Sequence, residues 1–261
     1  METLELSFIL FKIDALKDRN ILRYVHNKIK EQNLTIKAKF SVDLNGEQVD
    51  YMWPLRIFDF VSNYLLKKYM TGHSLLVYVL EGEEALGKTL LIKKEVRAIY
   101  QRSRYSNCIH TPSSEDECKL QLLCLQGECV DIPSITPYPS LFLKFPELDI
   151  ERLTLCANNL YKIILDTNFE LEYDAYMKSS DKYYLFLKLD FRFSINEVVS
   201  ILYENLSVYK YSIEDIYKIA FGAEQIGQYP VISNDNYEEI SKIYQSLLLK
   251  GLSITVICNL A

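Results

Sequence analysis

The chain has 261 residues, of which 49% are hydrophobic and 25% charged, and its formal net charge is −6. This length accommodates two domains, and the composition is typical of folded globular proteins. The negative charge argues against a general nucleic-acid-binding protein. No apolar run approaches the roughly 20 residues of a membrane helix, and the first residues lack the basic start of a secretion signal. We therefore expect a cytoplasmic protein with no membrane partner.

The cysteine pattern argues against a structural metal. Six cysteines are scattered without any Cys-x-x-Cys pair, and only three histidines accompany them. This pattern predicts reduced thiols and no protein-bound metal site.

The first half of the chain alternates strand and helix patterns. Apolar residues alternate or run together at 6–12, 34–42, 74–80 and 105–109, which predicts four strands. Helical spacing predicts helices at 20–32, 55–69, 83–95 and 114–123, the last capped by Ser113 or Ser114. The pair Asn45 and Gly46 predicts a turn.

A proline-rich segment separates the two halves. Pro133, Pro137 and Pro139 predict a stiff linker at 133–140, between a domain at 1–132 and a domain at 141–261. In the second half, strands are expected at 142–144, 169–176, 183–193 and 253–258, with 169–176 and 183–193 forming a hairpin. Helices are expected at 150–166, 195–206, 213–222 and 237–249. This order predicts a second α+β domain, whose role the residues do not indicate.

The most informative chemistry lies between residues 97 and 110. Arg97, Asn107 and His110 are separated by ten and three residues. A short apolar run precedes His110, and a predicted polar turn follows it. A neutral imidazole beside a guanidinium can accept a phosphoryl group, because the imidazole is nucleophilic near pH 7 and the cation neutralises the phosphate oxygens.

A second motif competes with this interpretation. Residues 82–89 match Gly-x-x-x-x-Gly-Lys-Thr, between a predicted strand and a predicted helix, as in a phosphate-binding P-loop. A P-loop NTPase is nevertheless disfavoured, because Glu83 and Glu84 would place two negative charges inside the phosphate cradle. Lys88 can contact nucleotide phosphates under either interpretation.

Four collinear segments over residues 6–123 resemble nucleoside diphosphate kinases. Arg97, Asn107 and His110 keep the spacing of that family's catalytic strand, and residues 8–15 resemble its first strand, with Lys12 in the Lys-Pro-Asp ending. Residues 69–73 and 77–82 resemble a Tyr-Met-x-Ser-Gly-Pro segment and the following strand with its Glu-Gly. The resemblance implies an α+β fold: a ferredoxin-like α/β sandwich with an antiparallel sheet, to which the second domain is added.

The resemblance also implies residue roles. His110 is the phosphoryl acceptor, Lys12 and Arg97 bind phosphate, and Asn107 contacts the ribose. Tyr51 supports the histidine and Phe58 stacks on the base. The substrates are nucleoside triphosphates and diphosphates, with Mg²⁺ held mainly by their phosphates.

Several positions depart from the family pattern. Its glycine and serine after the histidine are Thr111 and Pro112 here, and its imidazole-orienting glutamate falls at Gln121, with Glu117 among the carboxylates that could substitute. A family arginine falls near Leu90, and a loop before Arg97 is missing. We therefore expect specialised phosphoryl transfer through a phosphohistidine at His110. A non-catalytic nucleotide-binding or scaffold module is the alternative. A protein or larger substrate reached through the second domain, and a homo-oligomer, remain open as partners.

Overall fold

The computed structural model describes residues 4–54, 60–101, 106–128, 145, 148–166, 173–174, 176–178, 181–190 and 192–259. Its contacts divide the chain into two compact units, Met1–Pro137 and Tyr138–Ala261. The expected linker at 133–140 and the expected strand at 142–144 lie outside the described residues. Among the described residues, no helix combines the length and apolar composition that crossing a bilayer requires.

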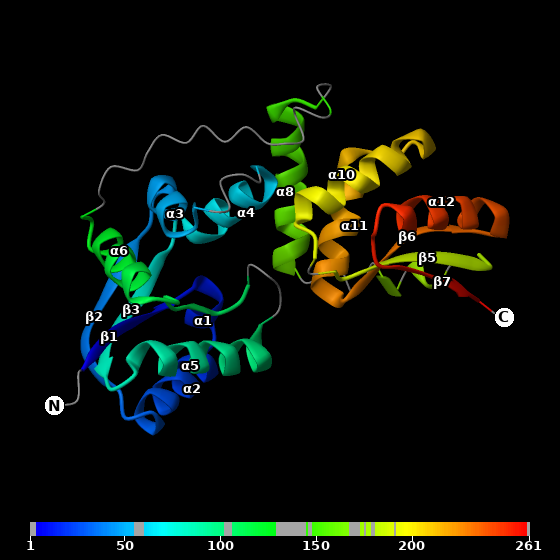
Figure 1. Cartoon of the computed structure of the whole chain (residues 1–261). Helices are drawn as coiled ribbons and strands as arrows, with labels where there is room; N and C mark the ends of the chain where they lie inside the picture. Colours follow the sequence, from blue (N-terminus) through cyan, green and yellow to red (C-terminus); the bar gives the residue numbers. More distant parts are fainter. Residues whose placement is uncertain are drawn as a thin grey trace. The chain divides into compact units, whose positions relative to one another are not determined.

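The first unit is built on a four-stranded antiparallel sheet with the order β2-β3-β1-β4 (Figure 1). The strands are β1 (Glu5–Phe11), β2 (Thr35–Asp43), β3 (Ser74–Gly82) and β4 (Ile109–His110). This order is that of the ferredoxin-like sandwich, so the predicted α+β class and antiparallel sheet are confirmed. Strand β4 is short and lies at the edge of the sheet, where one of its sides has no neighbouring strand among the described residues.

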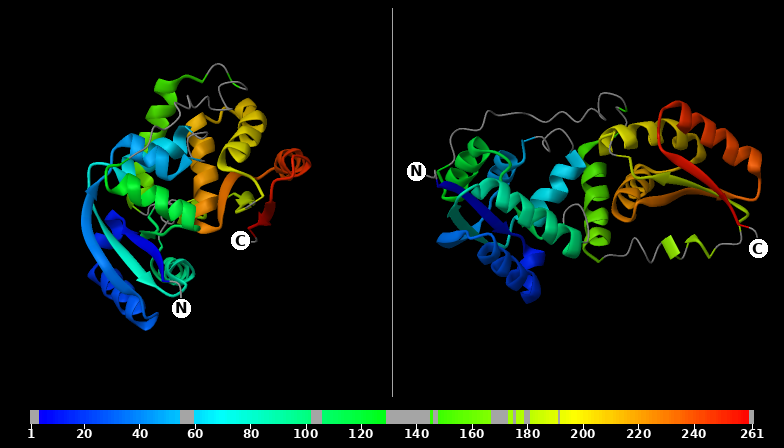
Figure 2. Two further views of the ribbon diagram at one scale, coloured as in Figure 1. Left: turned by 60° about the vertical axis from the view of Figure 1, so that its left-hand side comes forward. Right: turned by 60° about the horizontal axis from the view of Figure 1, so that its bottom comes forward.

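Helices cover both faces of this sheet. One face packs against α1 (Ile13–Lys17), α2 (Arg19–Glu31) and α5 (Ala85–Tyr100), and the other packs against α3 (Gly46–Met52) and α6 (Glu115–Leu125) (Figures 1 and 2). Helix α4 (Phe60–Met70) contacts α3. The central strand β1 is buried on both sides because its alternating side chains point to opposite faces. Ile9 and Phe11 join the core with α2 and α5, whereas Phe8 lies on the face of His110.

Two local predictions in this unit need correction. Asn45 and Gly46 do not form a simple turn. Asn45 is the N-cap of α3, because its side chain accepts from the Gln48 N–H while the Gln48 side chain accepts from the Asn45 N–H. The strand expected at 105–109 is only Ile109–His110 among the described residues, because the chain bends sharply at Cys108.

The second unit contains a three-stranded antiparallel sheet with the order β6-β5-β7. Its strands are β5 (Tyr183–Lys188), β6 (Gln228–Asn234) and β7 (Ile254–Cys258). Its helices are α8 (Ile150–Asp166), α10 (Ile195–Leu206), α11 (Ile213–Ile226) and α12 (Tyr237–Leu249), with a 3-10 turn, η2 (Ser207–Tyr209). The helix predictions at 150–166, 195–206 and 237–249 agree with the observed bounds.

The predicted hairpin of the second unit is wrong. The described residues Tyr173, Asp174 and Tyr176 are helical, and the Met177 N–H donates to the Tyr173 carbonyl. Strand β5 pairs instead with β6, which sequence analysis missed because Pro230 interrupts its pattern. Pro230 is tolerated because β6 is an edge strand among the described strands and its pairing with β5 is irregular between Leu185 and Phe186.

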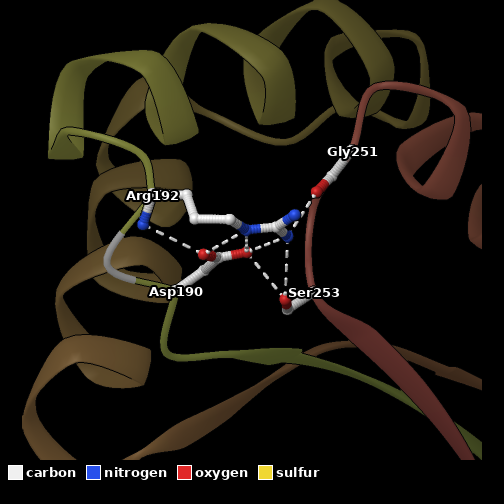
Figure 3. A network of polar contacts seen from close by, with 4 residues as sticks. All are labelled: Asp190, Arg192, Gly251 and Ser253. Carbon is white, nitrogen blue, oxygen red and sulfur yellow. Dashed lines mark hydrogen bonds and ion pairs between the residues drawn. The ribbon is translucent and has the colours of Figure 1, made fainter.

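A polar network ties the end of β5 to the segment that enters β7 (Figure 3). The Arg192 guanidinium pairs with the Asp190 carboxylate at 2.5 Å and donates to the Gly251 carbonyl at 3.0 Å. Ser253 donates to the same carboxylate at 2.6 Å. These hydrogen bonds, with that of Arg192 the largest cause, hold the pKa of Asp190 below its usual value.

Candidate functional site

The segment before His110 is held by a half-buried carboxylate. Asp14, at the start of α1, accepts hydrogen bonds from the Tyr69 hydroxyl, from the Ser106 hydroxyl at 3.2 Å and from the Cys108 N–H at 2.7 Å. Cys108 has a φ of +66°, a left-handed conformation that costs a non-glycine residue about 1–2 kcal/mol. The contacts of Asp14 therefore stabilise a strained bend that sets the direction of the following strand.

Lys12 follows β1 and contacts this bend, because its backbone N–H donates to the Cys108 carbonyl. Its side chain is buried, and its ammonium donates to Asn107 Oδ1 at 2.7 Å. The ammonium also lies 5.8 Å from the centroids of both the Trp53 and Tyr69 rings. Aromatic faces attract a cation, and the buried Lys12 contributes a positive charge that acts on the site.

His110 lies on β4, paired in register with Leu10 of β1. Its Nε2 is 2.8 Å from Gln121 Oε1 on α6. The amide nitrogen of Gln121 donates to the Met52 carbonyl at 3.0 Å and to Glu117 Oε1 at 2.9 Å. Both of these partners are acceptors, so the orientation of the amide is fixed and its oxygen faces the imidazole. His110 must therefore carry its proton on Nε2, which leaves the lone pair on Nδ1.

The imidazole is neutral in this environment. His110 is 7% exposed, and its ring contacts Phe8 and Trp53, with ring centroids 6.0 and 5.0 Å away. Burial, opposed by the hydrogen bond to Gln121 and reinforced by nearby cations, lowers the pKa of His110 to about 3. The unprotonated Nδ1 that nucleophilic chemistry requires is thus present at neutral pH.

Helix α5 supplies two further cations along the open side of β4. Arg97 Nη2 donates to the Ile109 carbonyl at 3.0 Å, and Lys93 Nζ donates to the Thr111 carbonyl at 3.1 Å. These carbonyls belong to the residues on either side of His110. With Lys12, the two side chains give the site three positive charges, all of which disfavour the protonation of His110.

The neighbouring thiol is not a competing nucleophile. Burial and the Asp14 carboxylate raise the pKa of Cys108 to about 12, and its Sγ donates to the Tyr100 carbonyl at 3.5 Å. Since the thiolate is the reactive form of cysteine, His110 is the nucleophile that this arrangement favours.

The structure brings four of the residues selected from the sequence, Lys12, Arg97, Asn107 and His110, to one place. Tyr51 lies on α3, next to the residue whose carbonyl accepts from Gln121, and Phe58 lies outside the described residues. Lys88 lies near the start of α5, and no hydrogen bond or ion pair joins it to the site among the described residues.

The structure does not support the P-loop alternative. The strands of the first unit are antiparallel, whereas a P-loop belongs to a parallel sheet. Thr89 is buried, and its hydroxyl hydrogen-bonds to Ser7 and to the Leu86 carbonyl. The Glu5 carboxylate accepts from the Leu86 N–H at the start of α5, where a P-loop would hold phosphate.

Sequence analysis missed two residues of the site, Lys93 and Trp53. Lys93 precedes Arg97 by four residues on α5, and this spacing, which places two cations on one helix face, was the available signal. Trp53 follows Tyr51 by two residues and is the only tryptophan of the chain. Glu117, named as a possible substitute for the missing glutamate, acts on Gln121 rather than on His110 directly.

Among the described residues, no group of three or more His, Cys, Asp or Glu side chains could hold a metal ion. Asp14 already accepts three hydrogen bonds, and Glu117 accepts from Ser113 and Gln121. The charged groups that act on His110 are the cations Lys12, Lys93 and Arg97. This part of the described structure therefore supplies no set of carboxylates that could hold a resident metal ion.

No protein-family model and no curated protein matches the chain. Solved structures of nucleoside diphosphate kinases match about half of it. The enzyme of Aquifex aeolicus shares 20% identity with a TM-score of 0.41, over 49% of this chain and 100% of that chain. The enzyme of Halobacterium salinarum, solved in complex with CDP, shares 16% identity with a TM-score of 0.40, over 50% and 94%. That of Encephalitozoon cuniculi shares 20% identity with a TM-score of 0.38, over 50% and 94%.

Proposed function

We propose that this protein transfers a phosphoryl group from a nucleoside triphosphate through a phosphohistidine at Nδ1 of His110. The observation that carries the proposal is the fixed amide of Gln121. Because its oxygen accepts from Nε2–H, the free lone pair of the ring lies on Nδ1, beside three cations and without a contacting carboxylate among the described residues. A neutral nucleophile among desolvated cations suits an anionic phosphoryl donor.

The proposed reaction has two steps. The Nδ1 lone pair forms a bond to the γ-phosphorus, the bond from phosphorus to the bridging oxygen breaks, and its electron pair leaves on the nucleoside diphosphate. The ring then carries the phosphoryl group on Nδ1 and its proton on Nε2, where Gln121 Oε1 stabilises the positive charge. In the second step an acceptor oxygen attacks the phosphorus, and the N–P electron pair returns to Nδ1. Catalysis is therefore mainly positioning and charge neutralisation.

The surrounding residues have separate roles in this proposal. Lys12 and Arg97 bind phosphate oxygens, and Asn107, oriented by Lys12, contacts the ribose. Tyr51 and Phe58 keep the support and base-stacking roles that the resemblance gives them. Magnesium enters with the nucleotide.

The two residues that follow His110 favour a specialised activity. Thr111 and Pro112 are both buried, and Pro112 offers no backbone N–H to an incoming phosphate. Exchange of the phosphoryl group between free nucleoside triphosphates and diphosphates should therefore be slow, because charging and discharging of His110 are one step run in opposite directions. A chase of the labelled protein with a panel of diphosphates measures this, with a nucleoside diphosphate kinase as the reference.

Incubation with γ-labelled ATP tests the chemistry. Wild-type protein should form an acid-labile, base-stable adduct that His110→Ala abolishes, whereas the matched controls His26→Ala and His73→Ala should keep it. Labelling that survives in His110→Ala would place the nucleophile elsewhere.

One observation favours the alternative of a non-catalytic nucleotide-binding module. His110 is only 7% exposed, and Trp53 lies against its ring, so a phosphoryl donor reaches Nδ1 only if nearby side chains move. Wild-type protein that binds ADP but forms no adduct would support this alternative.

A further inference from the structure

The open side of β4 carries two cations from α5, and the proposed function assigns a specific role to only one of them, Arg97. Two carbonyls on this side, those of Ile109 and Thr111, accept hydrogen bonds from side chains of α5 rather than from a neighbouring strand. The donors, Arg97 and Lys93, lie one helical turn apart. His110 is the residue between the two carbonyls, so both cations flank the proposed nucleophile along the chain.

These two cations have no carboxylate partner among the described residues within the 4.0 Å that defines an ion pair. Lys93 is half-buried, and its ammonium has one described acceptor for three protons. A glutamine or asparagine side chain at position 93 could donate to the Thr111 carbonyl without the cost of partly burying a charge. The carboxylates that act on these cations from beyond ion-pair distance, Asp14 on Arg97 and Glu117 on Lys93, only partly offset the cost of burying two like charges together.

Two buried polar atoms at this place also lack a hydrogen-bond partner among the described residues. They are Arg97 Nε and Thr111 Oγ1, and Thr111 is only 1% exposed. Most buried polar groups in proteins are hydrogen-bonded. A guanidinium N–H, a hydroxyl and an ammonium with unused protons can all donate to phosphate oxygens.

We infer that Lys93, together with Arg97 Nε and the Thr111 hydroxyl, binds the phosphates of a nucleoside diphosphate or triphosphate beside His110. This inference rests on the proposed function and adds a residue that the resemblance does not supply, since the family's arginine falls at Leu90. The site then recognises the diphosphate group, whereas adenosine does not engage Lys93.

The charge state of Lys93 provides a signature of this role. Burial, together with Arg97 and Lys94 on the same helix and against the opposing effect of Glu117 on α6, lowers the pKa of Lys93 to about 8. A bound anion favours the ammonium form, so ADP binding should take up a proton between about pH 8 and pH 9.5. His110 stays neutral in this range and does not contribute to the uptake.

Calorimetric titration of the full chain with ADP tests the inference. Lys93→Gln should weaken ADP binding by about tenfold or more, the loss expected for a charged hydrogen-bonding partner. Lys93→Arg should stay within about threefold of wild type, because the charge is kept. The matched control is Lys94→Gln, which removes an exposed lysine of the same helix and should have no effect. Adenosine binding should be equal in all four proteins.

The proton uptake of the wild-type protein on ADP binding is an independent measurement, because it does not depend on whether a variant folds correctly. Titrations at pH 9 in buffers of different ionisation enthalpy should show proton uptake, and ADP affinity should fall from pH 7.5 to 9.5, whereas both effects should disappear in Lys93→Arg. The inference is overturned if Lys93→Gln binds ADP as tightly as Lys94→Gln, if it loses adenosine and ADP equally, or if wild type takes up no proton. Failure of the proposed reaction is distinguishable, because ADP binding would still depend on Lys93 while γ-labelled ATP formed no adduct.

Discussion

Placing a glutamate at position 121 should destabilise the first unit instead of improving the site. In Gln121→Glu the new carboxylate has no N–H to donate, so the Met52 carbonyl and Glu117 Oε1 each lose a hydrogen bond. The new carboxylate also faces Glu117 at the distance of the lost contact. Only the hydrogen bond from His110 Nε2 survives, and it becomes charge-assisted.

The magnitude follows from two contributions. Two like charges about 4 Å apart repel by about 4 kcal/mol at an effective dielectric of 20, and the half-exposed position of Glu117 reduces this to roughly 1–2 kcal/mol. An unpaired buried carbonyl costs about 1–3 kcal/mol more. After the stronger bond to His110 is subtracted, Gln121→Glu should lose about 2–4 kcal/mol at pH 7. The loss should shrink below pH 5, because repulsion raises the pKa of the new carboxyl and its protonation restores a donor.

Urea unfolding followed by tryptophan fluorescence measures this effect in the first unit alone, because Trp53 is the only tryptophan. The double variant Glu117→Gln with Gln121→Glu exchanges the amide and the carboxylate and should recover at least 1 kcal/mol. Glu115→Gln, on an exposed carboxylate in the same helical turn, is the matched control and should recover nothing. Equal stability of Gln121→Glu and wild type, or equal recovery by the control, would refute the reasoning.

Three further predictions concern the same unit. Asp14→Leu removes the acceptor of three hydrogen bonds and should lower the free energy of unfolding by about 3 kcal/mol or more in the same urea assay. An unchanged free energy would show that the bend at Cys108 forms without Asp14. Lys88→Ala should leave ADP affinity and labelling within about twofold, whereas a P-loop enzyme would lose nucleotide binding. Labelling from γ-labelled ATP should stay constant from pH 7 to pH 5, because the pKa of His110 is about 3 and the ring remains neutral; with the ordinary pKa of 6.5, the neutral fraction would fall to about 3% at pH 5.

The elements that the sequence predicted well are those whose pattern is dictated by burial. Strand β1 and the helices α10 and α12 have regular apolar spacing, and Ser114 caps α6 as expected because its side chain accepts from the Glu117 N–H. The short strand β4 could be placed only through the spacing of Asn107 and His110. Its two residues carry no periodicity of their own.

Other features depend on contacts between segments far apart in the chain. Pro230 argues against a strand when taken alone, but an edge strand tolerates it, and only the fold decides which strand lies at the edge. The orientation of Gln121 follows from the Met52 carbonyl, 69 residues away in the chain. The contribution of Lys93 likewise depends on the position of α5 beside β4, which no local pattern reveals.

The electrostatics of the site explain why an amide at position 121 is compatible with phosphoryl transfer at His110. A carboxylate beside His110 would raise the imidazole's pKa and partly neutralise the cations around it. The amide keeps the Nε2–H tautomer without adding negative charge, so it does not weaken the effect of Lys12, Lys93 and Arg97 on an anion that approaches Nδ1. The same three charges that disfavour a proton on His110 favour a phosphoryl group there, because the phosphoryl group brings negative charge whereas the proton brings positive charge. A buried histidine with a strongly depressed pKa is therefore an unfavourable general base in this environment but a suitable acceptor for phosphate.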